Sequence, residues 1–198
     1  MNSKLLLIPL TVVALLSGCG SDYSGPQQTF VSWHKSAVKG YSDASNELQY
    51  TEIWERREKG LCEKLPDGNI TDWVGVVERV GKNLLDTQES ANIDVRIYEG
   101  KSYLLFSTSA INVKTLVGSV ADSAAAIRLG FNPQTTIIKG TLLYDQLMML
   151  SEGDKVRISG RLIKDSMQGA CFYEMSLSMN GKIRWPEYVV KFSKIEKL

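Results

Sequence analysis

Residues 150–164 read LSEGDKVRISGRLIK and contain the pattern that most constrains the fold, a turn followed by alternating apolar and polar residues. Successive side chains of a strand point to opposite faces, so one face is predicted to be buried and the other solvated. The buried face would hold Val156, Ile158 and Leu162. The solvated face would hold Lys155, Arg157, Ser159 and Arg161. Gly160 takes an inward position, which favours a bulge or a bend at a barrel corner over a flat sheet.

Other segments after residue 70 show the same period of two. DWVGVVERV has valines at positions 74, 76 and 80, and NIDVRIYEGKSYLLF is typical of a hairpin that turns at residues 99–101. PEYVVKFSKI places on one side Tyr188, Val190 and Phe192. Two segments favour helices: SVADSAAAIRLG, ending at Gly130, and TLLYDQLMMLSEGD, ending at Gly153. The second helix would present on one side Leu143, Leu147 and Leu150.

The predicted order is three strands, a helix, and two or three strands, which is the plan of the OB-fold, a five-stranded Greek-key barrel. Residues 71–198 therefore resemble an OB-fold domain, and L..L..GDKVRISGRL is similar to the helix and fourth strand of the anticodon-binding-like group. The wider pattern of RREKGLC, DWVGVV, GDKVRISG, EMSLS and PEYVVKF resembles bacterial OB-fold proteins of unassigned function. That resemblance implies no activity and no catalytic residue.

Residues 29–70 have a different, helical period, so the chain is predicted to be mostly β with an N-terminal helical segment. Apolar residues recur at intervals of three and four from Phe30 onward. Gly40 interrupts this pattern, so one kinked helix and two consecutive helices are both open. The segment PDGN, residues 66–69, would end the helical part. A solvated helix face is indicated by Glu52, Glu55, Arg56, Glu58 and Lys59.

Residues 1–18 are predicted to be an export signal. Lys4 precedes an apolar run from Leu5 to Leu16, which is too short to span a bilayer as a helix. The following LSGC resembles the lipobox of bacterial lipoproteins, which implies cleavage before Cys19 and attachment of acyl chains such as palmitate to that cysteine. An ordinary secretory signal is the alternative. Residues 19–28 would form a flexible tether.

The lipobox resemblance implies a place in the bacterial cell envelope, anchored in the membrane and facing the periplasm. By the same resemblance, Gly20 after the cysteine favours the outer membrane over the inner membrane. If Cys19 is acylated, Cys62 and Cys171 remain as an even pair in an oxidising compartment, where such pairs usually form a disulfide. Two buried free thiols are the alternative. Both cysteines belong to the pattern of the similar bacterial proteins, which supports the disulfide.

The sequence offers little for catalysis. Its only histidine, His34, lies in the helical segment, where a surface or packing role is the simpler interpretation. HExxH, P-loop, GxGxxG and CxxC motifs do not occur. Acids gather at Asp145, Glu152 and Asp154, but a turn commonly carries acids. We therefore expect no enzyme activity, no cofactor and no metal site.

Nucleic-acid binding is the function that an OB-fold first suggests, through basic and aromatic side chains on its second and third strands. The candidate ligand face consists of Arg96, Tyr98, Lys101 and Tyr103. However, residues 71–198 carry 16 Lys and Arg against 14 Asp and Glu, a net charge of only +2. Because phosphate contacts dominate affinity for nucleic acid, this balance and an envelope location make nucleic acid an unfavourable partner.

Together these features predict a lipid-anchored, non-catalytic OB-fold module that binds a protein or an envelope glycan. The fold alone does not select the ligand. Two alternatives stay open at this point. One is an envelope exclusion or immunity lipoprotein of a mobile element, and the other is a protein that binds single-stranded nucleic acid.

Overall fold

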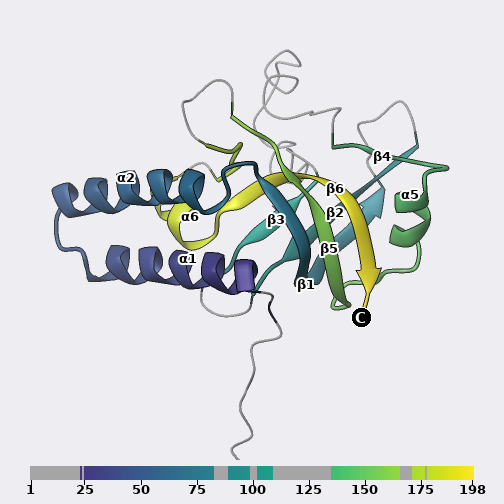
Figure 1. The fold of residues 1–198 in the computed structure, drawn as a ribbon, viewed down its shortest axis with the longest axis horizontal. Helices are drawn as coiled ribbons and strands as arrows, with labels where there is room; N and C mark the ends of the chain where they lie inside the picture. Colours follow the sequence, from purple (N-terminus) through teal and green to yellow (C-terminus); the bar gives the residue numbers. More distant parts are fainter. Residues whose placement is uncertain are drawn as a thin grey trace, which may run out of the picture.

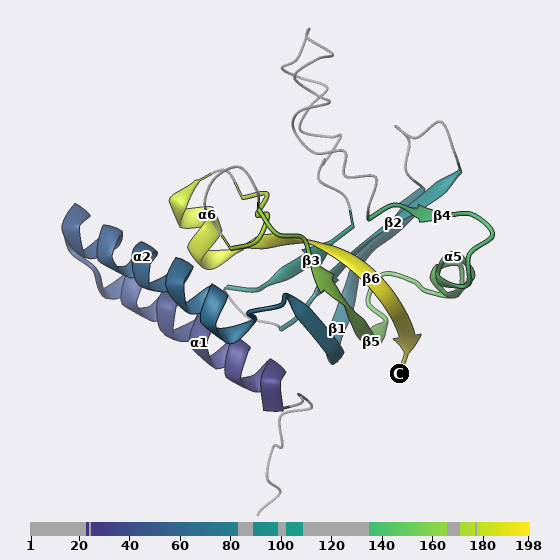
Figure 2. The same ribbon diagram turned by 45° about the horizontal axis from the view of Figure 1, so that its top comes forward.

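The computed structural model of the chain describes residues 23, 25–82, 89–98, 102–108, 135–165, 171–176 and 178–198. These residues form a β-barrel with a hairpin of two long helices packed against one end (Figure 1). A short helix lies at the opposite end of the barrel (Figure 2). The prediction of a mostly β chain with an N-terminal helical segment is confirmed.

The helical hairpin consists of α1, Gly25–Asp43, and α2, Glu47–Lys64. The break between them is at residues 44–46, where the Asn46 side chain accepts a hydrogen bond from the Gln49 backbone N–H at 3.1 Å and caps α2. Gly40 does not interrupt α1, and a Cβ at this position would make only an ordinary van der Waals contact, 3.7 Å from the Ile53 side chain of α2. Two consecutive helices are therefore formed. None of the described helices is both long and apolar enough to cross a membrane.

The first turn of α1 falls inside the predicted tether, so residues 25–28 belong to the folded part and the prediction for them was wrong. Gln27 explains why. Its side-chain amide is fully buried, donates to the Val74 carbonyl at 2.6 Å and accepts from the Val74 N–H at 2.8 Å. Tyr23, just before the helix, also packs against the hydrophobic core. The chain is thus held by the barrel from Tyr23 onward.

Five strands close the barrel: β1, Asn69–Lys82; β2, Ser90–Arg96; β3, Leu105–Ser107; β5, Lys155–Leu162; and β6, Glu187–Lys197. Their order around the barrel is β1–β5–β6–β3–β2, and β1 pairs again with β2. The β3–β6 pair is parallel and the other pairs are antiparallel. This arrangement, with a helix between the third and fourth barrel strands, confirms the predicted OB-type fold.

Three smaller elements complete the described part of the fold. Strand β4, Ile137–Ile138, extends the sheet along β2. Helix α5, Leu142–Leu147, is shorter than predicted but buries Leu147 against the core as expected. Helix α6, Met179–Arg184, lies between β5 and β6 and was not predicted. The other predicted helix, SVADSAAAIRLG, lies outside the described residues.

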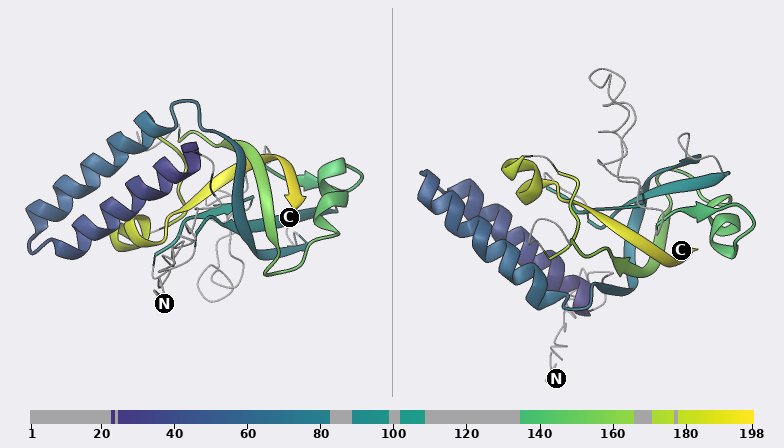
Figure 3. Two further views of the ribbon diagram at one scale, coloured as in Figure 1. Left: turned by 60° about the horizontal axis from the view of Figure 1, so that its bottom comes forward. Right: turned by 90° about the horizontal axis from the view of Figure 1, so that it is seen from above.

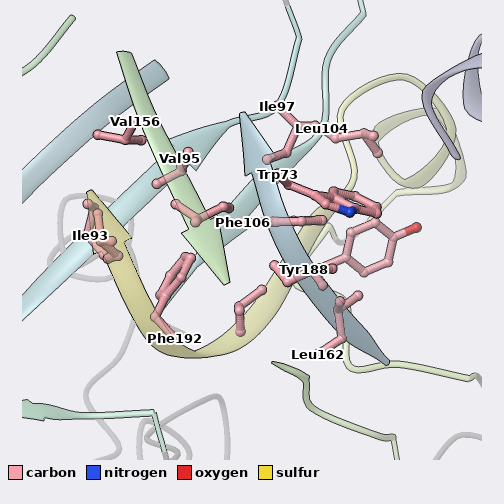
Figure 4. Close-up of a cluster of buried hydrophobic side chains, with 14 of the residues drawn as sticks. Trp73, Ile93, Val95, Ile97, Leu104, Phe106, Val156, Leu162, Tyr188 and Phe192 are labelled. Atoms are coloured by element: carbon pink, nitrogen blue, oxygen red, sulfur yellow. The ribbon is translucent and has the colours of Figure 1, made fainter. Parts of the chain in front are cut away.

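Aromatic side chains fill the barrel near the helical hairpin (Figure 4). The Trp73 ring lies 5.7 Å from Phe106 and 5.3 Å from Phe30 of α1, and Phe106 lies 6.2 Å from Tyr188. On β1, Trp73 and Val77 therefore point into the barrel. Val74 lies on the other side of the strand, beneath the start of α1. Burial of these rings joins hairpin and barrel in one hydrophobic core.

Strand β5 behaves as its alternation predicts. Val156, Ile158 and Leu162 are at most 1% exposed. Gly160 lies at a register irregularity between β5 and β6, which confirms the predicted bulge. A Cβ at Gly160 would lie 2.6 Å from the Lys191 carbonyl oxygen, so only glycine allows this close approach of the two strands.

Cys62 of α2 and Cys171 form a disulfide with their Cα atoms 5.4 Å apart, which confirms the predicted pair. The bond links the end of the helical hairpin to the segment that leads from β5 to β6. It therefore fixes, by a covalent bond, a contact between parts of the chain 109 residues apart.

The close approach at Gly160 gives a stability test. We expect Gly160→Ala to lower the free energy of unfolding by about 1–3 kcal/mol, because the methyl group meets backbone atoms that cannot rotate away. Gly81→Ala is the matched control, since a Cβ there would have no heavy atom within 4 Å. Urea denaturation of both variants measures the difference. Equal midpoints would show that the strands can separate at no cost.

The disulfide gives a second test. Replacing both cysteines, Cys62→Ser with Cys171→Ser, is expected to lower the free energy of unfolding by up to about 4–5 kcal/mol, because the unfolded chain regains the entropy of a large open loop. Denaturation under oxidising conditions measures the loss, and a reducing agent should affect only the parent protein. An unchanged midpoint in the double variant would contradict a stabilising role for the bond.

Candidate functional site

The outer surface of β2 and β3 is where OB-folds commonly bind their ligands, and here it carries a connected set of polar side chains. Ile93 and Val95 of β2 point into the barrel, so Asp94 between them points away from the barrel interior, although only 5% of its surface is exposed. Asp94 pairs across the sheet with Ser107 of β3, whose hydroxyl donates to the carboxylate at 2.6 Å. Arg79 of β1 donates to the other oxygen of Asp94 from Nε at 2.8 Å, and its Nη2 lies 2.7 Å away.

Glu187 at the start of β6 adds a second carboxyl group beside this set, because β6 runs parallel to β3 and pairs Glu187 with Leu105. Burial raises the pKa of Glu187 from 4.5 to about 7, and the negative charge of Asp94 acts in the same direction. The charge of Arg79 and a hydrogen bond with Ser107 oppose the shift. Near neutral pH this carboxyl group can therefore both donate and accept hydrogen bonds.

Arg96 and Glu78 extend the set toward the rim, with Nη1 and Oε2 3.3 Å apart. We call these side chains the polar face: Glu78, Arg79, Asp94, Arg96, Ser107 and Glu187. It holds two guanidinium groups and three carboxyl groups, so its net charge lies close to zero. Arg79 and Glu78 are 42% and 45% exposed, which leaves both accessible to a ligand.

Of the three predicted ligand residues that the structure describes, Arg96 alone lies on the polar face. The prediction for Tyr98 was wrong: this side chain is 4% exposed, because α1 covers the chain just after β2. Its ring lies 5.8 Å from the His34 ring and 5.0 Å from the Lys35 ammonium group. Tyr103 is half-buried, with its backbone N–H bound to the Arg184 carbonyl at 3.1 Å. Lys101 lies outside the described residues.

Sequence reasoning missed the centre of the polar face. The alternation around Asp94 indicated that it shares a side with Arg96, and this signal could have been used. The contributions of Arg79, Ser107 and Glu187 depend on strand register across three pairings, which a single sequence does not fix.

A second polar cluster lies beneath the helical hairpin. The Arg57 side chain is fully buried and donates from Nη2 to Glu174 at 2.9 Å and to the Tyr188 hydroxyl at 2.7 Å, while Nη1 pairs with Glu58. Burial raises the pKa of Glu174 to about 7, although the Arg57 charge opposes the shift. Since these groups bind one another across the joint between α2 and the barrel, we interpret the cluster as a structural connection.

His34 is also buried, which agrees with the expected packing role. Burial, followed by the charges of Arg57 and Lys35, lowers the pKa of His34 to about 3, so the imidazole is neutral at physiological pH. It stands against the Tyr98 ring, inside the contact between α1 and the barrel. Within the described residues, no three His, Cys, Asp or Glu side chains are grouped so that they could hold a metal ion.

Comparison with known proteins finds no matching family model, no matching curated protein and no matching solved structure. The function is therefore inferred from the geometry of the chain itself. That geometry offers a polar face on which Glu78, Arg79 and Arg96 are partly exposed and can form directional hydrogen bonds with a ligand.

The raised pKa of Glu187 predicts a pH dependence of stability. The folded protein binds this proton more tightly than the unfolded chain, so the contribution is complete below about pH 4.5 and is lost as the pH rises through about 7. Glu187→Gln removes the titrating group, and we expect a shallower fall of the free energy of unfolding across this window. Denaturation at a series of pH values measures the slope. Identical slopes in the two proteins would refute the assignment.

Proposed function

We propose that this protein is a lipid-anchored, non-catalytic binding module of the bacterial cell envelope. Its polar face would bind a protein or an envelope glycan in the periplasm. The observation that carries the binding part is the network joining Arg79, Asp94 and Ser107, because the buried Asp94 and Ser107 hold the exposed Arg79 side chain in one orientation before a ligand arrives. A preorganised site loses little conformational freedom on binding.

The composition of the polar face supports this ligand class over nucleic acid. Its three carboxyl groups would repel phosphates, which supply most of the affinity in nucleic-acid complexes. Of the two aromatic side chains predicted on the ligand face, Tyr98 is buried and Tyr103 is half-buried. Paired arginine and carboxylate side chains suit the hydroxyl and amide groups of glycans and protein surfaces, which both donate and accept hydrogen bonds.

The anchoring part of the proposal rests on the lipobox-like LSGC sequence. We expect Cys19→Ala to move the protein out of the membrane fraction, because the remaining chain would lose the acyl groups that hold it there. Fractionation of cells that produce the parent and the variant at equal levels measures this. Unchanged recovery in the membrane fraction would contradict lipid attachment at Cys19.

The binding part predicts that the rim of the polar face is required for capture of a partner. Glu78→Ala with Arg96→Ala removes one charge of each sign. We expect at least a tenfold loss of capture, which corresponds to a loss of ~1.4 kcal/mol of binding free energy. Crosslinking in intact cells, with quantification of captured protein and glycan, provides the measurement.

The matched control is Lys39→Ala with Asp43→Ala, which removes an exposed ion pair from α1 far from the polar face. The control should capture the partner as the parent does. Equal loss in both variants, or no loss in the first, would rule out the polar face as the ligand site.

A further inference from the structure

The outer surface of β5 and β6 is basic, in contrast to the polar face. Two of its outward cross-strand pairs are Arg161 with Lys191 and Ser159 with Lys194. In the adjacent outward pair, Arg157 lies opposite Glu196, which contributes a carboxylate to this surface. We call four side chains the basic face: Arg157, Arg161, Lys191 and Lys194. Within the described residues no carboxylate forms an ion pair with Arg157 or Lys191, while Lys194 lies 2.8 Å from Glu196.

The basic face lies beside the point where the chain enters the fold. Gln27 fixes the start of α1 to Val74 of β1, and Val74 pairs directly with Arg157 of β5. Figure 3, with the bottom of the molecule brought forward in its left view, shows the start of α1 next to β1, followed by β5 and β6. Any surface to which the N-terminal chain is attached is therefore close to the basic face.

The distance to that surface is limited by the length of the connection. Tyr23 already packs against the core, and three residues lie between it and Cys19, so four residue steps join the two. Even fully extended, four residues span at most about 14 Å. In physiological salt, the electrostatic field of a charged membrane decays over about 8 Å. A connection this short allows cations beside the start of α1 to approach the membrane within that distance.

The barrel order determines what such a contact would do to the opposite side. Following β1–β5–β6–β3–β2 around the closed barrel, β2 stands opposite the pair formed by β5 and β6. Asp94 and Arg96 lie on β2, so this part of the polar face points away from the basic face, while Glu187 lies at the start of β6, the strand that also carries Lys191 and Lys194. A membrane that contacts the basic face would therefore leave Asp94 and Arg96 of the polar face on the side of the periplasm.

We propose that the basic face rests on anionic phospholipid headgroups and thereby turns the polar face away from the membrane. This inference rests on the proposed lipid anchor at Cys19, because the short connection is what brings the barrel to the bilayer. Four cations are few for a nucleic-acid site, whereas a tethered protein needs only a weak second contact to fix its orientation.

The test uses the full acylated protein in vesicles of phosphatidylcholine, with and without phosphatidylglycerol. Acetylation of individual lysines by a water-soluble reagent is followed by mass spectrometry. We expect Lys191 and Lys194 to react several-fold more slowly in the anionic vesicles, and high salt to remove this protection. Lys39 and Lys59, which are 79% and 81% exposed on the hairpin, should react equally in both. Equal rates for Lys191 and Lys194 in the two vesicles would overturn the proposal.

Charge variants make the test specific to one surface. Lys164 is exposed just after β5 and should also be protected in the parent protein by anionic vesicles. In Arg157→Gln with Lys191→Gln and Lys194→Gln, it should lose this protection. The control, Arg56→Gln with Lys39→Gln and Lys59→Gln, removes three positive charges from the exposed side of the hairpin. In this control, Lys164 should keep its protection in anionic vesicles. Circular dichroism verifies that both variants are folded. Retained protection in the first variant would contradict the assigned surface.

The outcome also separates this proposal from the anchor on which it rests. An N-terminal peptide without acyl mass, and a protein that fails to float with either vesicle, would defeat the anchor itself. An acylated protein that floats without protecting Lys191 and Lys194 would defeat only the orientation. Protection of these lysines by dissolved single-stranded DNA, but not by anionic vesicles, would overturn the lipid surface in favour of a polymeric anion.

Discussion

One buried guanidinium group determines how the two parts of this protein fit together. Arg57 of α2 has no exposed side-chain surface and binds Glu58, Glu174 and the Tyr188 hydroxyl. Breaking a buried ion pair by removing one partner typically costs about 3–5 kcal/mol, because the other charge is left without compensation. The hairpin therefore cannot leave the barrel without exposing or stranding these groups, and the nearby disulfide restricts the same movement.

The position of the hairpin has two consequences for function. It covers the aromatic end of the barrel, so Tyr98 contributes to the contact with α1 and is removed from the surface available to ligands. It also delivers the start of α1 to the outer side of β1, next to β5. The polar face and the basic face are thus distinct surfaces, centred on β2 and on the β5–β6 pair at opposite positions of the barrel order.

The sequence predicted those features that depend on local pattern. The alternation of β5, the bulge at Gly160 and the general order of the barrel follow from side-chain period and from the special backbone of glycine. The cysteine pair followed from residue counting once export was assumed. The sequence left open one kinked helix or two helices because Gly40 weakens a helix in isolation, yet α1 continues through Gly40 and ends at Asp43.

Features that depend on packing between distant segments were missed. Arg57 looked like its neighbour Arg56 in a charged helix, and only the fold shows that one faces the barrel and the other water. Gln27 looked like part of a polar tether until its two bonds to Val74 were known. The composition of the polar face depends on register between strands, which one chain without relatives does not reveal.

The central claim is that two opposite surfaces of one barrel have different partners. The most direct test is photocrosslinking in living cells. A photoreactive amino acid is incorporated into the protein either at position 78 on the polar face or at position 194 on the basic face. We predict that position 194 yields phospholipid adducts, whereas position 78 yields a protein or glycan adduct. Phospholipid adducts at position 78, or the same partner at both positions, would contradict it.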